Sequence, residues 1–241
     1  DLYLASLLAA VLNEKNLFSA GHSSYRQADL ALQIEEFLRN PNSFNTRKIK
    51  ISSEEIYRVV DNKNKSQAKD LDLSRLGILL SFAYPDRIAR SREKKSLRYK
   101  LSSGKGATLR ENDSLAGNDF LVIAELDGDN KESTIFSAAK ITLDEIIEFH
   151  KEKIQLKLNG YLEEKTGRIS VFEEKTLNGL VLASREIQSA VTPELLTGVW
   201  RNYILDKGLS VLPWIEDVEN FRMRSEFLRL LGEDLPNLEN E

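Results

Sequence analysis

A glycine-rich basic segment is the part of the chain that most resembles a phosphate-binding loop. It reads Ser-Gly-Lys-Gly-Ala-Thr from Ser103 to Thr108. A Walker A loop needs Gly-x4-Gly-Lys-[Ser/Thr], because its backbone amides hold the phosphates while its hydroxyl binds magnesium. If Lys105 were that lysine, Tyr99 would stand in place of the first glycine and Gly106 in place of the hydroxyl. We therefore predict a basic β-hairpin turn here.

Histidines and carboxylates could supply acid–base or metal chemistry, but their spacing fits no such site. The two histidines, His22 and His150, stand far apart in no metal-ligand or triad pattern, and we expect both on the solvated surface. Neither a Gly-x-Ser-x-Gly nor a His-Glu-x-x-His motif occurs. Residues 127–130 lack the twelve-residue ligand spacing of a calcium loop and predict a turn. No catalytic residue and no metal ligand is assigned.

A dense run of positive charge is the feature that could bind a ligand. Between Tyr84 and Arg110 the only acidic residues are Asp86 and Glu93. The next segment, residues 111–129, contains several aspartates and glutamates but no lysine or arginine. Arginine and lysine neutralise phosphates, and aromatic side chains such as Phe82, Tyr84 and Tyr99 could stack on bases. A solvated strand face that balances the acidic segment is the alternative. The nine basic residues are Arg87, Arg90, Arg92, Lys94, Lys95, Arg98, Lys100, Lys105 and Arg110.

Composition narrows the class of protein. The chain has 241 residues, a net charge of −4 and no cysteine, which excludes disulfides and cysteine-based zinc sites and fits a reducing cytoplasm. No apolar run approaches the roughly 18 to 20 residues that span a bilayer, so no membrane partner is expected. The chain begins at Asp1 and its single methionine is Met223, from which we expect a piece of a longer protein.

Helices are predicted to precede the basic stretch. Apolar residues recur at helical spacing over residues 4–12 and 30–38. Ser52 and Glu55 have the spacing of a capping box that would begin another helix. Asp72 is expected to cap a helix that ends before the proline preceding the basic stretch.

Strands follow, and helices return at the end of the chain. Alternating or continuous apolar residues predict strands over residues 97–101, 120–126, 134–141, 154–158, 168–172 and 180–187. Thr142 and Glu145 form a second capping box. Thr192 should cap a later helix that ends near Gly208. Trp200, Trp214 and Phe221 are expected to pack in a core. The predicted class is α+β: helices, a small β-barrel or curled sheet with further strands, then helices.

Two segments, residues 79–92 (LLSFAYPDRIARSR) and residues 98–107 (RYKLSSGKGA), have a recognisable pattern. They resemble the "AYPDRIARRR" and "RYxLxxGxGA" segments of bacterial HrpB-type ATP-dependent helicases, relatives of the DEAH-box RNA helicases. Residues 115–128 match the pattern "LAGxxxLxVAxLDG" in part. Residues 4–17 with 28–34, and residues 206–214 and 221–230, also look like the family.

The resemblance implies an architecture and a parent activity. Residues 1–75 would be the remnant of a helical ratchet domain, 76–150 an OB-like β domain, and 151–241 a β-strand and helical extension of the HrpB group. The parent would translocate on RNA or remodel it as a cytoplasmic NTP hydrolase that needs ATP and Mg²⁺. No Walker A, Asp-Glu-x-His or arginine motif of the RecA-like motor occurs here, so no cofactor is expected in this segment and it would not hydrolyse ATP by itself.

The resemblance also suggests partners and contact residues. Arg87, Arg90, Arg92, Arg98 and Lys105 become candidate contacts to single-stranded RNA or DNA. Arg87 could instead pair with its neighbouring aspartate or cap the preceding helix. The RecA-like motor domains of the same polypeptide would be a second partner. An alternative function is a protein-interaction module, carried by residues 154–187, that docks the helicase onto another protein.

Overall fold

The computed structural model describes eight stretches of the chain, and these group into two compact units. The first unit comprises Asp1–Gln155 and Lys175–Leu182, and the second comprises Leu156–Glu174 and Ala183–Glu241. The earlier predictions on His22, on residues 128–130 and on Trp214 fall outside the described residues. The described residues are 1–14, 27–40, 43–60, 71–93, 96–127, 132–187, 192–212 and 215–236.

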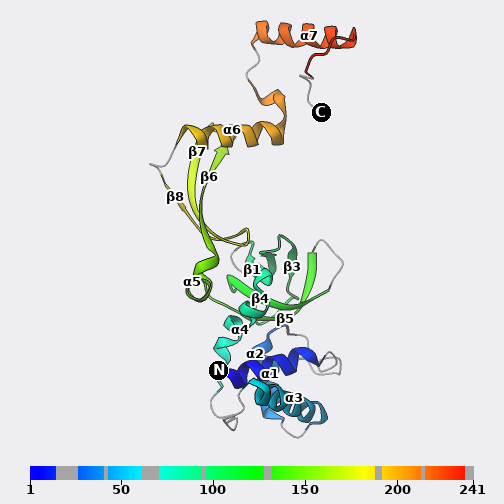
Figure 1. Ribbon diagram of the computed structural model, residues 1–241, viewed down its shortest axis with the longest axis vertical. Helices are drawn as coiled ribbons and strands as arrows, with labels where there is room; N and C mark the ends of the chain where they lie inside the picture. Colours follow the sequence, from blue (N-terminus) through cyan, green and yellow to red (C-terminus); the bar gives the residue numbers. More distant parts are fainter. Residues whose placement is uncertain are drawn as a thin grey trace. The chain divides into compact units, whose positions relative to one another are not determined.

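The first unit opens with helices, as the apolar periodicity predicts (Figure 1). The N-terminal ends of α1 and α2 are capped by Asp1 and Asp29, whose carboxylates accept backbone N–H groups of the first turn. In α4, apolar residues pack against strands of the barrel that follows. The helices are α1 (Leu2–Asn13), α2 (Leu30–Arg39), α3 (Phe44–Val60) and α4 (Leu76–Ala83), with short 3₁₀ turns at Leu73–Arg75 and Pro85–Arg87.

The capping box predicted at Ser52 and Glu55 is wrong, because both residues lie inside α3. The neighbouring hydroxyl of Ser53 donates to the carbonyl of Lys50 at 2.9 Å, one turn back. Serine can therefore be satisfied within a helix as well as at its start, and the box spacing alone does not distinguish the two. Asp72 does cap the 3₁₀ turn that leads into α4, as predicted.

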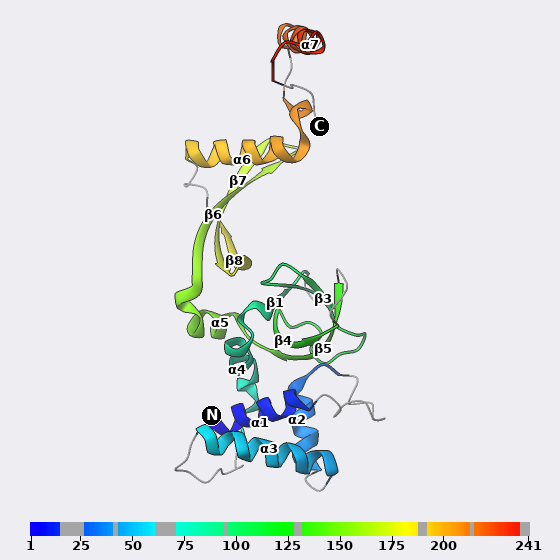
Figure 2. The ribbon, with the colours of Figure 1, turned by 45° about the vertical axis from the view of Figure 1, so that its right-hand side comes forward.

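Five strands then close a small barrel in the order β1-β2-β3-β5-β4 (Figures 1 and 2). Neighbouring strands are antiparallel except β3 and β5, which run parallel. This closure is that of an OB-like barrel, and it confirms the α+β class with a small barrel. The strands are β1 (Ile88–Ser91), β2 (Arg98–Leu101), β3 (Gly106–Thr108), β4 (Phe120–Leu126) and β5 (Glu132–Lys140).

Two apolar clusters hold the first unit together. One fills the barrel and includes Tyr99, Leu101, Leu121 and Ile123. The other lies on the outer face of β4 and β5, where apolar side chains of the helices cover residues such as Val122. Strand β4 therefore contributes to both clusters, which explains why its sequence is apolar without alternation.

A three-stranded antiparallel sheet follows α5 (Leu143–Phe149) and the 3₁₀ turn Lys151–Lys153, and its order is β6-β7-β8. The capping box of Thr142 and Glu145 opens α5 as predicted. Asn178 and Gly179, with φ of 49° and 84°, form the turn between β7 and β8, a conformation that asparagine and glycine favour. The strands are β6 (Ile154–Glu163), β7 (Arg168–Leu177) and β8 (Leu180–Glu186).

The turn end of the β7–β8 hairpin belongs to the first unit. Leu177, Leu180 and Leu182 are buried in the cluster on the outer face of the barrel. The rest of the sheet belongs to the second unit. Residues that are distant in sequence thus complete the covering of β4.

Two helices end the chain, α6 (Pro193–Lys207) and α7 (Glu216–Leu230), with a 3₁₀ turn at Leu209–Val211 between them. Thr192 caps α6 and Gly208 ends it, as predicted. Gly160 of β6 lies against Val199 of α6, so closely that a side chain at position 160 would collide with the valine. Trp200 of α6 and Phe221 of α7 were expected in a core, but 43% and 63% of these residues are exposed. Among the described residues, no helix is long and apolar enough to cross a membrane.

Candidate nucleic-acid interface

Strand register gathers part of the basic stretch on the outside of the barrel. Arg90 of β1 lies directly opposite Lys100 of β2. The N–H of Arg92 donates to the carbonyl of Arg98 at 2.9 Å, which extends the pairing by one step. Because Tyr99 and Leu101 point into the barrel, the basic residues that alternate with them point outward. We call the side chains of Arg90, Arg92, Arg98 and Lys100 the basic face.

The members of the basic face differ in how they are held. Arg92, Arg98 and Lys100 are exposed. Arg90 is half-buried, and its Nη1 donates to the carbonyl oxygen of Val181 at 2.8 Å. Arg90 therefore ties β1 to the turn end of the β7–β8 hairpin and has less freedom to contact a ligand.

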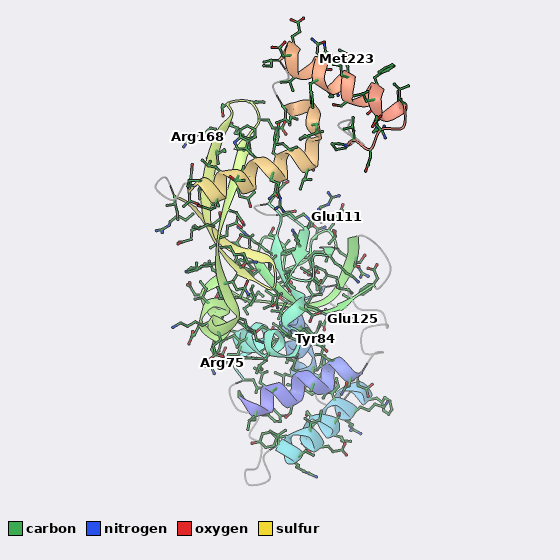
Figure 3. The ribbon with its side chains drawn as sticks, turned by 45° about the horizontal axis from the view of Figure 1, so that its top comes forward. Arg75, Tyr84, Glu111, Glu125, Arg168 and Met223 are labelled. Atoms are coloured by element: carbon green, nitrogen blue, oxygen red, sulfur yellow. The ribbon has the colours of Figure 1, made fainter. Side chains whose placement is uncertain are left out.

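Arg87 is held by contacts other than the two that the sequence suggested, which were a pair with Asp86 and a cap on the preceding helix. Its Nη1 donates to the carbonyl oxygen of Ala124 at 2.5 Å, and its guanidinium lies 4.8 Å from the ring centre of Tyr84. Tyr84 is the residue that directly follows α4 (Figure 3). Arg87 thus joins the end of α4 to strand β4 of the barrel.

Lys105 lies in the turn between β2 and β3. Its carbonyl accepts the N–H of Leu101 at 2.9 Å, and Gly104 has a φ of +87°, which favours glycine. The basic hairpin turn predicted for this glycine-rich segment is therefore confirmed. The side chain of Lys105 is exposed beside the basic face.

Among the aromatic residues that the sequence offered for base stacking, Tyr99 and Tyr84 pack with the apolar clusters, whereas Phe82 is 58% exposed. Tyr99 is fully buried in the barrel, and its hydroxyl donates to the carbonyl of Asn118 at 2.9 Å. Burial, with the nearby charges of Asp113 and Asp119, raises the pKa of Tyr99 to about 12. Phe120 is buried as well, and Phe82 packs edge-on against Phe149.

His150 is buried, which corrects the expectation of a solvated histidine. Only 3% of it is exposed, its Nε2 lies 2.7 Å from the hydroxyl oxygen of Ser81, and its ring lies beside Phe82. Burial lowers the pKa of His150, and the positive charge of Lys153 lowers it further. The neutral ring therefore serves the packing of α4 against the end of α5.

Sequence reasoning missed a cation–aromatic pair on the outer surface of the barrel. The guanidinium of Arg110 lies 5.2 Å from the ring centre of Phe136, which is 37% exposed. Phe136 alternates with the inward-facing Ile135 in β5. That alternation was visible in the sequence, but the parallel pairing of β3 with β5 that brings Arg110 near was not.

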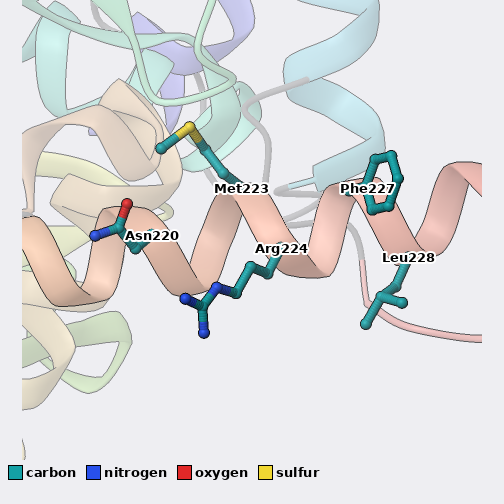
Figure 4. A pocket seen from close by; sticks show the side chains of 5 residues that line it. All are labelled: Asn220, Met223, Arg224, Phe227 and Leu228. Atoms are coloured by element: carbon teal, nitrogen blue, oxygen red, sulfur yellow. The ribbon is translucent and has the colours of Figure 1, made fainter.

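Other places in the described part of the chain are weaker candidates for a binding site than the basic face. An open apolar hollow runs along α7 and is lined by Asn220, Met223, Arg224, Phe227 and Leu228 (Figure 4). Within the described ranges, no group of three or more histidine, aspartate or glutamate side chains could hold a metal ion. The basic face is the site in the described residues that best fits a polyanionic ligand.

Comparison with known proteins finds similarity in both sequence and fold. The chain is 29% identical over 157 residues to the ATP-dependent RNA helicase HrpB of Escherichia coli K12, a match that covers 64% of this chain and 19% of that protein. Two crystal structures of E. coli HrpB, described as a DExH-box NTPase and as a DEAH/RHA helicase, superpose with TM-scores of 0.58 and 0.60 at 24% and 23% identity. Each superposition covers 98% of this chain and 27% of the solved chain. No protein-family model matches the chain.

Proposed function

Because the chain is similar to a region of HrpB-type helicases, spanning about a fifth to a quarter of their length, we propose that it is the accessory region of such an enzyme. In this role it binds single-stranded RNA and guides it with respect to the RecA-like motor domains of the same polypeptide. ATP and Mg²⁺ would be bound by those motor domains, since no motor motif occurs in this sequence. The helicase would act in the cytoplasm.

The observation that supports RNA binding is the basic face. Three exposed cations form this group: Arg98 and Lys100 lie on β2, and Arg92 directly follows β1, whose pairing with β2 sets their spacing. Adjacent strands lie about 5 Å apart, so the cations form a compact group although the chain as a whole is negative. Such a group attracts a phosphate backbone without reading its sequence.

The candidate residues divide by role within this proposal. Arg92, Arg98 and Lys105 contact phosphates directly, because their side chains are exposed. Arg87 and Arg90 donate to the carbonyls of Ala124 and Val181, so they position the strands that present the other cations.

The test is a titration of fluorescein-labelled single-stranded RNA with the wild type and with Arg98→Glu/Lys100→Glu. Micromolar binding that weakens with added salt is expected for the wild type, and the double variant should lose it. The matched control is Lys151→Glu/Lys157→Glu, which makes the same charge change at exposed positions outside the basic face. Equal losses in both variants, or no wild-type binding at low salt, contradict the proposal.

A second function, docking onto a protein, is favoured by one feature of β6. Leu156 and Leu158 are 64% and 46% exposed on this edge strand of the three-stranded sheet. Exposed apolar residues on an edge strand are typical of surfaces that meet another chain. In this case the chain would co-sediment with a motor-domain fragment or another partner, and Leu156→Lys/Leu158→Lys would abolish that association while leaving RNA binding unchanged.

A further inference from the structure

Phe136 is a partly exposed aromatic side chain on the outside of the barrel, 37% of which is accessible. It belongs to neither of the two apolar clusters, although residues on both sides of it in β5 are buried. Its described ring contact is the guanidinium of Arg110 at 5.2 Å. Single exposed apolar residues are common on protein surfaces, so what sets Phe136 apart is its position relative to the basic face.

The register of the barrel places this ring next to the basic face. Arg98 pairs with Thr108 of β3, and Thr108 pairs with Thr134 of β5. Phe136 follows Thr134 by two residues and therefore lies on the same outward side. Two strand spacings and two residues separate Arg98 from Phe136, roughly 10 Å across and roughly 7 Å along the strands.

Cations beside an aromatic ring form the combination that single-stranded nucleic acids need. Cations neutralise the backbone, while a base stacks on the ring, and a guanidinium can stack on a base as well. A paired duplex keeps its base faces covered by neighbouring bases, so a ring on a strand surface can reach a base face only in an unpaired nucleotide.

We propose that Phe136 and Arg110 form a base-stacking site for one unpaired nucleotide of a strand whose phosphates lie on the basic face. This inference rests on the proposed RNA-binding function and extends it from phosphate contacts to base contacts. The site selects single strands over duplexes and has little preference among bases, because every base offers a stacking face.

The experiment compares Phe136→Leu with the wild type in titrations of a labelled single-stranded RNA. Loss of one stacked base should weaken binding by about 5-fold or more. Phe136→Trp should restore binding, and the emission of the new tryptophan should be quenched when RNA is added. The same RNA with abasic positions should bind the wild type and Phe136→Leu equally, since it offers no base to stack.

The first unit supplies a matched control for the substitution. Phe44 of α3 is also exposed and has the cation of Lys48 at 5.3 Å from its ring centre, but it lies outside the barrel. Phe44→Leu should leave the affinity for RNA unchanged.

The outcomes separate this inference from the function on which it rests. If the wild type binds RNA in a salt-dependent way but Phe136→Leu binds as tightly, the stacking site is refuted while the phosphate contacts stand. An equal affinity for abasic and ordinary RNA refutes it as well. If the wild type binds no RNA, the proposed function itself fails.

Discussion

At the scale of single residues, several charged side chains serve the fold. Asp113 stands at the start of the acidic segment, yet it is buried and its two carboxylate oxygens accept the backbone N–H groups of Ala28 at 2.7 Å and Leu115 at 3.0 Å. The carbonyl of Ala28 accepts the N–H of Ala138 at 2.8 Å. Asp113 therefore fastens the chain before α2 to the barrel.

Replacing Asp113 with alanine should destabilise the first unit by about 2–4 kcal/mol, because two buried N–H groups would lose a charged acceptor. Urea denaturation followed by circular dichroism measures this free energy of unfolding. Glu111→Ala, an exposed change in the same loop, is the control and should cost less than about 0.5 kcal/mol. A small effect of Asp113→Ala would show that water replaces the carboxylate.

His150 should make stability depend on pH. Its pKa is lowered in the folded protein, so below about pH 6.5 the unfolded chain takes up a proton that the folded chain resists. The contribution of this residue to stability is therefore full above that pH and is lost as the pH falls toward the lowered folded pKa. Thermal unfolding between about pH 7.5 and about pH 5.5 should show a steeper loss for the wild type than for His150→Gln. Parallel curves would contradict this assignment.

The residue types of the site could be predicted from the sequence, but their roles could not. The concentration of positive charge is visible in the sequence, and the basic hairpin turn followed from the glycines. Arg87 and Arg90, however, bond to carbonyls that are 37 and 91 residues away. Tyr99 looks like a stacking residue until the barrel closes around it. Such roles depend on contacts between distant segments, which a local pattern does not contain.

At the scale of elements, local signals in the sequence predicted where helices and strands lie, but they did not predict which strands pair. Capping residues placed the starts of α5 and α6, and alternation placed most strands. The closing of the barrel requires β3 to run parallel to β5, across an intervening strand, and no spacing in the sequence specifies that. The turn end of the β7–β8 hairpin is a second example, since its packing on the barrel follows from neither strand alone.

The hairpin end should contribute strongly to the stability of the first unit. Leu180 is buried in the cluster on the outer face of the barrel, so Leu180→Ala should cost about 2–4 kcal/mol in its free energy of unfolding. Leu158→Ala on the exposed part of β6 is the matched control and should cost less than about 1 kcal/mol. Similar costs for the two variants, measured by thermal unfolding, would argue against the hairpin's role in the barrel's core.

At the scale of the whole molecule, net charge and function point in opposite directions. A chain with a net charge of −4 repels RNA on average, so any binding must come from a local group of cations. Screening by salt does not separate these two effects, because it weakens both the attraction of the basic face and the repulsion by the remaining surface. The counterions released from the RNA depend only on the phosphates that are neutralised.

The dependence of RNA affinity on salt should therefore count the cations of the basic face. Three phosphate contacts, one for each exposed cation of the basic face, predict a slope of about −2 when the logarithm of the association constant is plotted against the logarithm of the salt concentration. Arg98→Gln should make this slope shallower by about 0.7, because one contact is removed without adding a negative charge. Lys157→Gln, on the exposed part of β6, removes a charge of the same sign and should leave the slope unchanged. If both substitutions change the slope equally, RNA is held by the diffuse field of the molecule, and the basic face has no special part in binding.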